Sequence, residues 1–226
     1  MSILKELDKK DFNEENFVKK ILNDKKILED LFEGVLSKKD EIRFNSHKVL
    51  TIISEKHPEL IYSKWSFFEE LLSSENNYHK FIGLNIIANL TKYDTEKKFE
   101  KIFDKYYNML SDNSTMIVGH VTAKSGRIAK AKPNLQPKIT EKLLNIDTIH
   151  KGKQIELVKA YVIDAFDEYV NEVKNKKEIM EFIKKQVKVI FYTVYLVCKV
   201  ILYTVILLHN FIIITVNLMY YDIGDI

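Results

Sequence analysis

The sequence predicts an all-α protein of about five stacked helix pairs, and three observations support that fold class. Apolar residues repeat at helical spacing along most of the chain. Only 6 Gly and 3 Pro occur among 226 residues, which leaves few turns and disfavours an all-β protein. A leucine followed by a small polar residue recurs in steps of 36, 38 and 34 residues, at Leu36-Ser37, Leu72-Ser73, Leu110-Ser111 and Leu144-Asn145. Such a period is typical of arrays in which no helix pair buries its apolar side alone.

The first two pairs are predicted between residues 14 and 72. The phrase from Ser37 to Asp40 has the Ser-x-x-acid form of a capping box, so we expect a helix to begin there. Pro58 is expected to end that helix, because the residue before a proline is disfavoured in the α conformation. The other helices of these pairs are predicted at residues 14–23, 26–36 and 63–72.

The third pair begins near Asn77, and Asp94 is placed to cap its second helix. The apolar residues of that second helix follow an i, i+3, i+4, i+7 series. The fourth pair begins near Ser114 and is rich in small residues. Gly119 and Gly126, with an alanine between them, share one helix face, which predicts the close approach of a neighbouring helix.

An internal repetition supports the same register. The phrase Ile-x-x-x-x-Pro-x-Leu occurs at residues 53–60 and again at 128–135, 75 residues later. Two periods of about 37 residues give that offset. The fifth pair is predicted at residues 153–173 and 176–187.

One repeat resembles the HEAT-type, armadillo-like helical repeat. That repeat places an aspartate near the start of its first helix, then an aliphatic-arginine pair and a small residue, and the matching residues here are Asp40, Ile42-Arg43 and Ser46. The resemblance covers about residues 14–186 and implies a right-handed α-α superhelix, or α-solenoid. It also implies that Asp40 and Arg43 are structural residues that tie neighbouring repeats together. The next repeats depart from the pattern, with Asn77 and Lys80 in one and Ile117 in another.

The chain is predicted to divide into a helical repeat domain, residues 1–186, and an atypical hydrophobic tail, residues 187–226. Residues 200–221 form a stretch without formal charge, and this stretch is long enough for a membrane-spanning helix. The lysines before this stretch would then leave the repeat domain in the cytoplasm. Two other interpretations stay open. The tail is either an out-of-frame, frameshift-derived segment, or a buried terminal helix or β-rich segment.

Composition and motifs exclude several function classes. The net charge of +3 is a small difference between 35 basic and 32 acidic residues, which disfavours nucleic acid as a partner, because phosphate binding needs a clustered basic face. The single cysteine, Cys198, cannot form an internal disulfide and suits a reducing, cytoplasmic compartment. The six histidines lack metal-ligand spacing, and no phosphate loop or hydrolase motif occurs. We therefore expect no catalytic residue, metal or cofactor.

The first candidate partner-binding group lies on a predicted second helix. Lys98, Lys101 and Lys105 share one of its faces, and in HEAT-type arrays the second helices usually line the concave side. Such a row would meet an acidic partner. Asp104 interrupts the row, so a solvated charged face is the alternative interpretation.

The second candidate group lies on the small-residue helix of the fourth pair. It consists of His120, Lys124 and Arg127. Arg127 would suit a bidentate contact with a partner. The alternative is that Arg127 pairs with an acid on the adjoining repeat.

The function predicted from these features is that of a non-enzymatic scaffold or adaptor, which binds another protein along its concave face. The first alternative is a DNA-binding protein similar to the HEAT-like alkylation-repair glycosylases, whose basic groove would give binding to duplex DNA a steep salt dependence. The second alternative is a tether that is anchored in a membrane through residues 200–221.

Overall fold

The computed structural model describes residues 3–173, 176–188 and 199. The chain divides into two compact units, Met1–Ile179 and Met180–Ile226, and this division lies N-terminal to the boundary predicted at residue 186. The described residues form helices and turns and include no strand, so the all-α prediction is confirmed for them.

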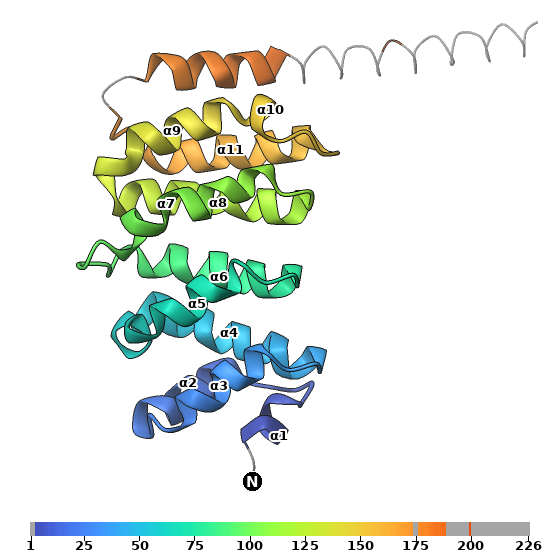
Figure 1. The fold of residues 1–226 in the computed structure, drawn as a ribbon, viewed down its shortest axis with the longest axis vertical. Coiled ribbons are helices and arrows are strands. Elements are labelled where there is room, and N and C mark those ends of the chain that lie inside the picture. Colours follow the sequence, from blue (N-terminus) through green and yellow to red (C-terminus); the bar gives the residue numbers. More distant parts are fainter. Residues whose placement is uncertain (1–2, 174–175, 189–198, 200–226) are drawn as a thin grey trace, which may run out of the picture. The chain divides into compact units, whose positions relative to one another are not determined.

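The first-row helices are the ones that open the predicted pairs. They are α2 (Glu14–Asn23), α4 (Asp40–Lys56), α6 (Asn77–Leu90), α8 (Thr115–Ala131) and α11 (Ile155–Tyr169). Each of them contacts the next along the chain, and Figure 1 shows α4, α6 and α8 one above another in sequence order.

The second-row helices pack beside the first row. They are α3 (Ile27–Val35), α5 (Trp65–Leu71), α7 (Lys98–Asn108) and α9 (Gln136–Leu144). For example, α3 contacts α4, α5 contacts α6, and α9 contacts α8, whereas contacts between successive second-row helices are sparser. The short elements are α1 (Ile3–Leu7), α10 (Ile146–Ile149), and the 3-10 turns η1 (Pro58–Leu60), η2 (Tyr62–Lys64), η3 (Met109–Ser111) and η4 (Pro133–Leu135). In the second unit, residues 180–188 are helical.

The repeated Ile-x-x-x-x-Pro-x-Leu phrase has one structural meaning at both of its positions. In each copy a first-row helix ends just before the proline, and the proline begins a 3-10 turn, η1 or η4. Proline suits the first position of such a turn because its fixed φ is compatible and its missing N–H is not needed there. The repetition is therefore the signal that turns the chain from the first row to the second.

Small residues let α8 and α11 come close together, as the sequence predicts. A Cβ atom added to Gly126 would lie 2.6 Å from the backbone oxygen of Ala165 and 2.9 Å from the side chain of Glu168. At Gly119 an added Cβ would lie 3.1 Å from the ring of Tyr161. Gly126 therefore sets the spacing between the two helix backbones, whereas Gly119 faces only a side chain.

Asp94 joins two helix ends and a turn within the first unit. Its Oδ1 and Oδ2 accept hydrogen bonds of 2.9 Å from the backbone N–H groups of Lys98 and Phe99, which confirms that Asp94 caps α7. The buried Lys132, just past the end of α8, donates to Asp94 Oδ2 and to its backbone oxygen, both at 2.8 Å. Tyr62 donates its hydroxyl to Asp94 Oδ1 at 2.5 Å. One carboxylate therefore holds the start of α7, the end of α8 and the turn before α5.

Two details of the prediction need correction. The capping box at Ser37 is not formed: α4 begins at Asp40 after Lys39, and the hydroxyl of Ser37 instead accepts from the backbone N–H of Lys39 at 3.1 Å. Ser37 therefore lies two residues before the N-cap position, which Lys39 occupies. The short helix α1 was not expected in the charged N-terminal segment, yet it buries Leu7 completely.

The predicted membrane-spanning stretch, residues 200–221, lies outside the described residues. In the part of the chain that the structure describes, no helix is both long enough and apolar enough to span a membrane.

We predict that Gly126→Ala destabilises the protein by about 1–3 kcal/mol, because the new methyl group would overlap the backbone of α11. In an unobstructed helix the same change stabilises by about 1 kcal/mol. Urea unfolding followed by circular dichroism measures the free energy of unfolding of the variant and of the unmodified protein. Gly119→Ala is the matched control on the same helix. It should cost less, and equal effects of the two changes would contradict the proposed role of Gly126.

Candidate protein-binding face

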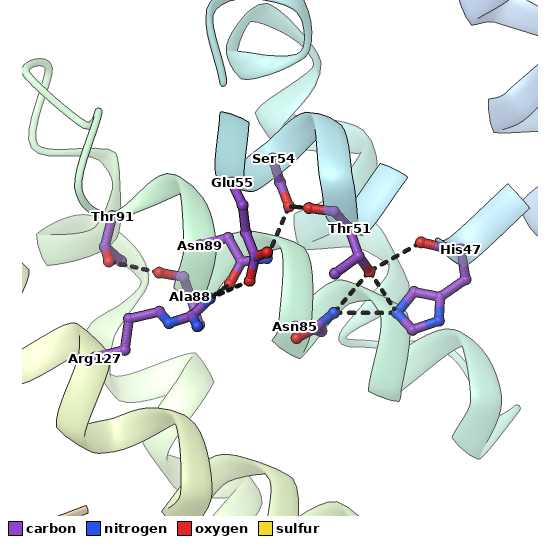
Figure 2. Close-up of polar contacts among 9 residues, drawn as sticks. All are labelled: His47, Thr51, Ser54, Glu55, Asn85, Ala88, Asn89, Thr91 and Arg127. Carbon is purple, nitrogen blue, oxygen red and sulfur yellow. Dashed lines mark hydrogen bonds and ion pairs between the residues drawn. The ribbon is translucent and has the colours of Figure 1, made fainter. Parts of the chain in front are cut away.

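Polar side chains connect the first-row helices α4 and α6 (Figure 2). Asn85 on α6 donates to His47 Nε2 at 3.1 Å and to Thr51 Oγ1 at 3.0 Å, both on α4. One turn further along, Asn89 donates to Ser54 Oγ at 2.8 Å. Asn85, Asn89, His47 and Ser54 are all buried, and their bonds satisfy polar groups that would otherwise be costly to bury.

Arg127 extends this set of contacts to α8. Its Nη1 donates to Glu55 Oε1 on α4 at 2.8 Å and also to Asn89 Oδ1 on α6, so one guanidinium joins three consecutive first-row helices (Figure 2). We call His47, Thr51, Ser54, Glu55, Asn85, Asn89 and Arg127 the polar ladder. Arg127 therefore does pair with an acid, as the alternative interpretation predicts. That acid, Glu55, belongs to the second pair and not to the adjoining third pair, which contributes Asn89 instead.

Several of the polar contacts between neighbouring pairs share one interval. The hydrogen bonds from Asn85 to His47, from Arg127 to Asn89, from Lys132 to Asp94 and from Thr115 to the backbone of Lys153 each join residues 38 positions apart. This interval lies in the same range as the spacing of the leucine pairs in the sequence. The polar contacts and the recurring apolar pattern therefore follow the same register.

Apolar and aromatic side chains from the N-terminal halves of the first-row helices lie beside the polar ladder. We call this group the apolar stripe, and its members are Phe44, Tyr78, Phe81, Met116, Leu157 and Tyr161. Phe81 on α6 lies 4.7 Å from the ring of His47 and 4.3 Å from the ring of His120, so these rings connect α4, α6 and α8. Phe44, Met116 and Leu157 are 49%, 48% and 46% exposed.

Two hollows adjoin the stripe and the ladder. One, of about 420 Å³, lies between α8 and α11, and Met116, His120, Lys124, Leu157 and Tyr161 are among its lining residues. The other, of about 540 Å³, lies at the C-terminal ends of the first-row helices. Acids and bases are mixed along its walls, which include Glu55, Lys92, Arg127, Lys130, Glu168 and Glu172.

Burial keeps the two histidines of this face neutral at pH 7. Removal from water, with the nearby charge of Lys124, lowers the pKa of His47 to about 4. The same causes, in the same order, lower the pKa of His120. The acceptor role of His47 Nε2 toward Asn85 agrees with a neutral ring, because a protonated ring would place two donors against each other.

The structure separates the two predicted groups of basic residues. His120, Lys124 and Arg127 lie on α8, beside the apolar stripe and the polar ladder. Lys98, Lys101 and Lys105 lie on the second-row helix α7. Lys98 lies 4.1 Å from the ring centre of Tyr62 and 3.6 Å from Glu96, and Lys105 lies 3.5 Å from Glu69. Two of these three lysines therefore already have partners within the protein.

Asp40 and Arg43 form an ion pair within α4 instead of across two repeats. Arg43 also donates to the backbone oxygen of Ser37 at 3.0 Å and reaches the next pair through the ring of Tyr78, at 4.7 Å. Lys80, by contrast, forms an ion pair with the next helix pair, donating to Asp112 at 2.9 Å. The structural role that the resemblance implies for Asp40 and Arg43 stays a prediction.

Sequence reasoning missed most of the polar ladder. The signal was the spacing of polar residues inside apolar helices: His47, Thr51 and Ser54 are four and three residues apart on α4, and Asn85 and Asn89 are four apart on α6. Such spacing places side chains on one helix face. The spacing of the large apolar residues alone does not reveal this face.

In residues 3–173, 176–188 and 199, no group of three or more His, Cys, Asp or Glu residues is arranged to hold a metal ion. Comparison with protein-family models, curated proteins and solved structures gives no match to this chain.

We predict that His47 makes stability fall with acid. Its pKa is about 4 in the folded protein, against 6.5 for an ordinary histidine, so below pH 6.5 the unfolded chain binds a proton that the folded protein excludes. Between pH 6.5 and 4 this group should lower the free energy of unfolding by about 2–4 kcal/mol.

Urea unfolding at several pH values checks this prediction. In His47→Gln that part of the pH dependence should disappear, whereas His120→Gln, at a half-buried position, should remove less of it. An unchanged slope in His47→Gln would contradict the prediction.

Proposed function

We propose that this chain is a non-enzymatic, protein-binding scaffold of the HEAT-like, armadillo-like type, with its helix pairs arranged as a right-handed α-solenoid. The chain of contacts from α2 to α11 and the 38-residue interval of the polar contacts support this proposal. In a repeat protein each unit contacts mainly its neighbours, so stability and surface both extend along the stack.

We place the partner-binding surface on the first row. The first-row helices contact one another more closely than the second-row helices do. A stack of pairs curves toward its more closely packed row, so the first row would line the concave side. This differs from the expectation that second helices line it, and it favours the group on α8 over the lysines of α7.

The observation that carries the proposal is the apolar stripe. Single exposed apolar residues are ordinary on protein surfaces, but continuous exposed patches mark interaction sites. Here the exposed Phe44, Met116 and Leu157 come from α4, α8 and α11, and the rings of Tyr78 and Phe81 on α6 lie between them. Aromatic residues and methionine are also the types enriched in protein interfaces.

The electrostatics of the first row favour a protein over duplex DNA. A DNA groove needs clustered positive charge. Glu55, Glu168 and Glu172 line the larger hollow together with its basic residues, so an incoming phosphate backbone would meet acids there. The proposal includes a cytoplasmic location, which suits a chain whose single cysteine, Cys198, cannot form an internal disulfide.

Site-specific photo-cross-linking in the protein's own cells tests the proposal. A benzophenone amino acid at Met116 should give a discrete cross-linked protein, because this side chain is exposed on the stripe. The matched control is the same amino acid at the exposed Lys101 on α7, which should give only background.

Specificity is checked with a second change. Leu157→Glu, at an exposed position on α11, should abolish the cross-link at Met116 without changing the melting temperature. Equal products from Met116 and Lys101, or a product that survives Leu157→Glu, would contradict the assignment of the first row as the binding face.

A further inference from the structure

The smaller hollow has mostly apolar walls, to which Thr115 and Gln154 add polar groups, and it contains a single charged group. Gly119 and Ala123 of α8 form part of its lining, and the larger side chains of Met116, Leu157 and Tyr161 stand around them. His120, whose pKa is lowered mainly by burial, also lines it. The charged group is Lys124, one turn after His120 on the same helix.

Lys124 differs from the other half-buried basic side chains of the first row. Arg43, Lys48, Lys80, Arg127 and Lys159 each pair with an acid, at Asp40, Glu14, Asp112, Glu55 and Asp147 respectively. The ammonium group of Lys124 makes no hydrogen bond or ion pair with any residue that the structure describes. Glu55 and Glu168 act on it only through longer-range attraction, and burial with the charge of Arg127 outweighs them in lowering its pKa.

An ammonium group that is partly removed from water without a partner is unfavourable. A carboxylate arriving from outside would relieve that cost, and the apolar walls would strengthen the attraction by excluding water. A phosphate fits less well. Its second negative charge would face a single lysine with Glu168 nearby, whereas phosphate sites use several basic groups.

We infer that the hollow between α8 and α11 docks a segment of the partner protein in which a large apolar side chain lies close to an Asp or Glu. The apolar side chain packs between Met116, Leu157 and Tyr161, and the carboxylate pairs with Lys124. This inference rests on the proposed function and adds the chemistry of the partner. Lys124 supplies charge specificity, and the walls supply most of the buried apolar area.

A random peptide library displayed on phage tests the inference, with the full chain as the bait. Peptides enriched on the unmodified protein should carry a large apolar residue near an Asp or Glu. On Lys124→Gln the preference for acids should disappear, and on Lys124→Glu it should change to Lys or Arg. The matched control is Lys101→Glu on α7, which should leave the enriched sequences unchanged.

Calorimetry with one enriched peptide measures how much each variant weakens peptide binding. Lys124→Glu should weaken its binding at least about tenfold, a change that corresponds to roughly 1.4 kcal/mol. Circular dichroism melting of each variant separates loss of binding from loss of folding. Lys124→Gln provides the readout if Lys124→Glu fails to fold.

Several results would overturn the inference. These are enrichment of apolar peptides without acids, enrichment of phosphopeptides over carboxylate peptides in a matched panel, unchanged affinity in Lys124→Gln, or no enriched peptide at all. The cross-linking at Met116 is independent of this selection. If the cross-link forms but the preference for acids is absent, the proposed function stands and the inference about Lys124 fails.

Discussion

The buried contact between Asp94 and Lys132 is the interaction on which the arrangement of the first unit depends. It joins the end of α8 to the start of α7, and Tyr62 connects the same carboxylate to the preceding pair. Burial raises the pKa of Asp94, but the hydrogen bonds from Lys132, Tyr62 and the α7 backbone outweigh it, so the net pKa is lowered and the group is ionised at pH 7. Removing one partner of such a pair costs about 3–5 kcal/mol, whereas replacing both by apolar groups is often neutral. The main consequence of the contact between Asp94 and Lys132 is therefore the register of the helix pairs, because the contact fixes which residues of successive pairs lie opposite each other.

Register matters because the candidate binding face is made of side chains from different pairs. The polar ladder holds α4, α6 and α8 at a fixed offset, and the missing side chain of Gly126 lets α11 follow closely. Only at that offset does Phe81 lie between the rings of His47 and His120. A shift of one helix by a single residue would turn these groups by about 100° and break the stripe. The packing of the helices and the geometry of the candidate binding face thus depend on the same contacts.

The positions of the helices could be predicted well from the sequence, whereas the candidate binding face could be predicted less well. Apolar spacing, Pro58 and the cap at Asp94 act within one helix or turn, so local rules reach them. The ladder and the pairing of Arg127 with Glu55 span as many as 72 residues, and nothing local identifies which acid a given arginine will meet. Single polar residues inside apolar helices were the available signal. The helix α1 was missed because five residues in a charged segment give no periodicity to detect.

Native-state hydrogen exchange on Asp94→Ala tests most directly the claim that one carboxylate couples successive pairs. The amide of Phe99 bonds to Asp94 itself, whereas the amide of Lys132 bonds to Ile128 within the last turn of α8. We expect both amides to lose protection in Asp94→Ala, and neither to do so in Glu15→Ala, which removes the exposed ion pair with Lys56. Loss at Phe99 with full protection at Lys132 would show that Asp94 merely caps α7, and it would contradict the coupling.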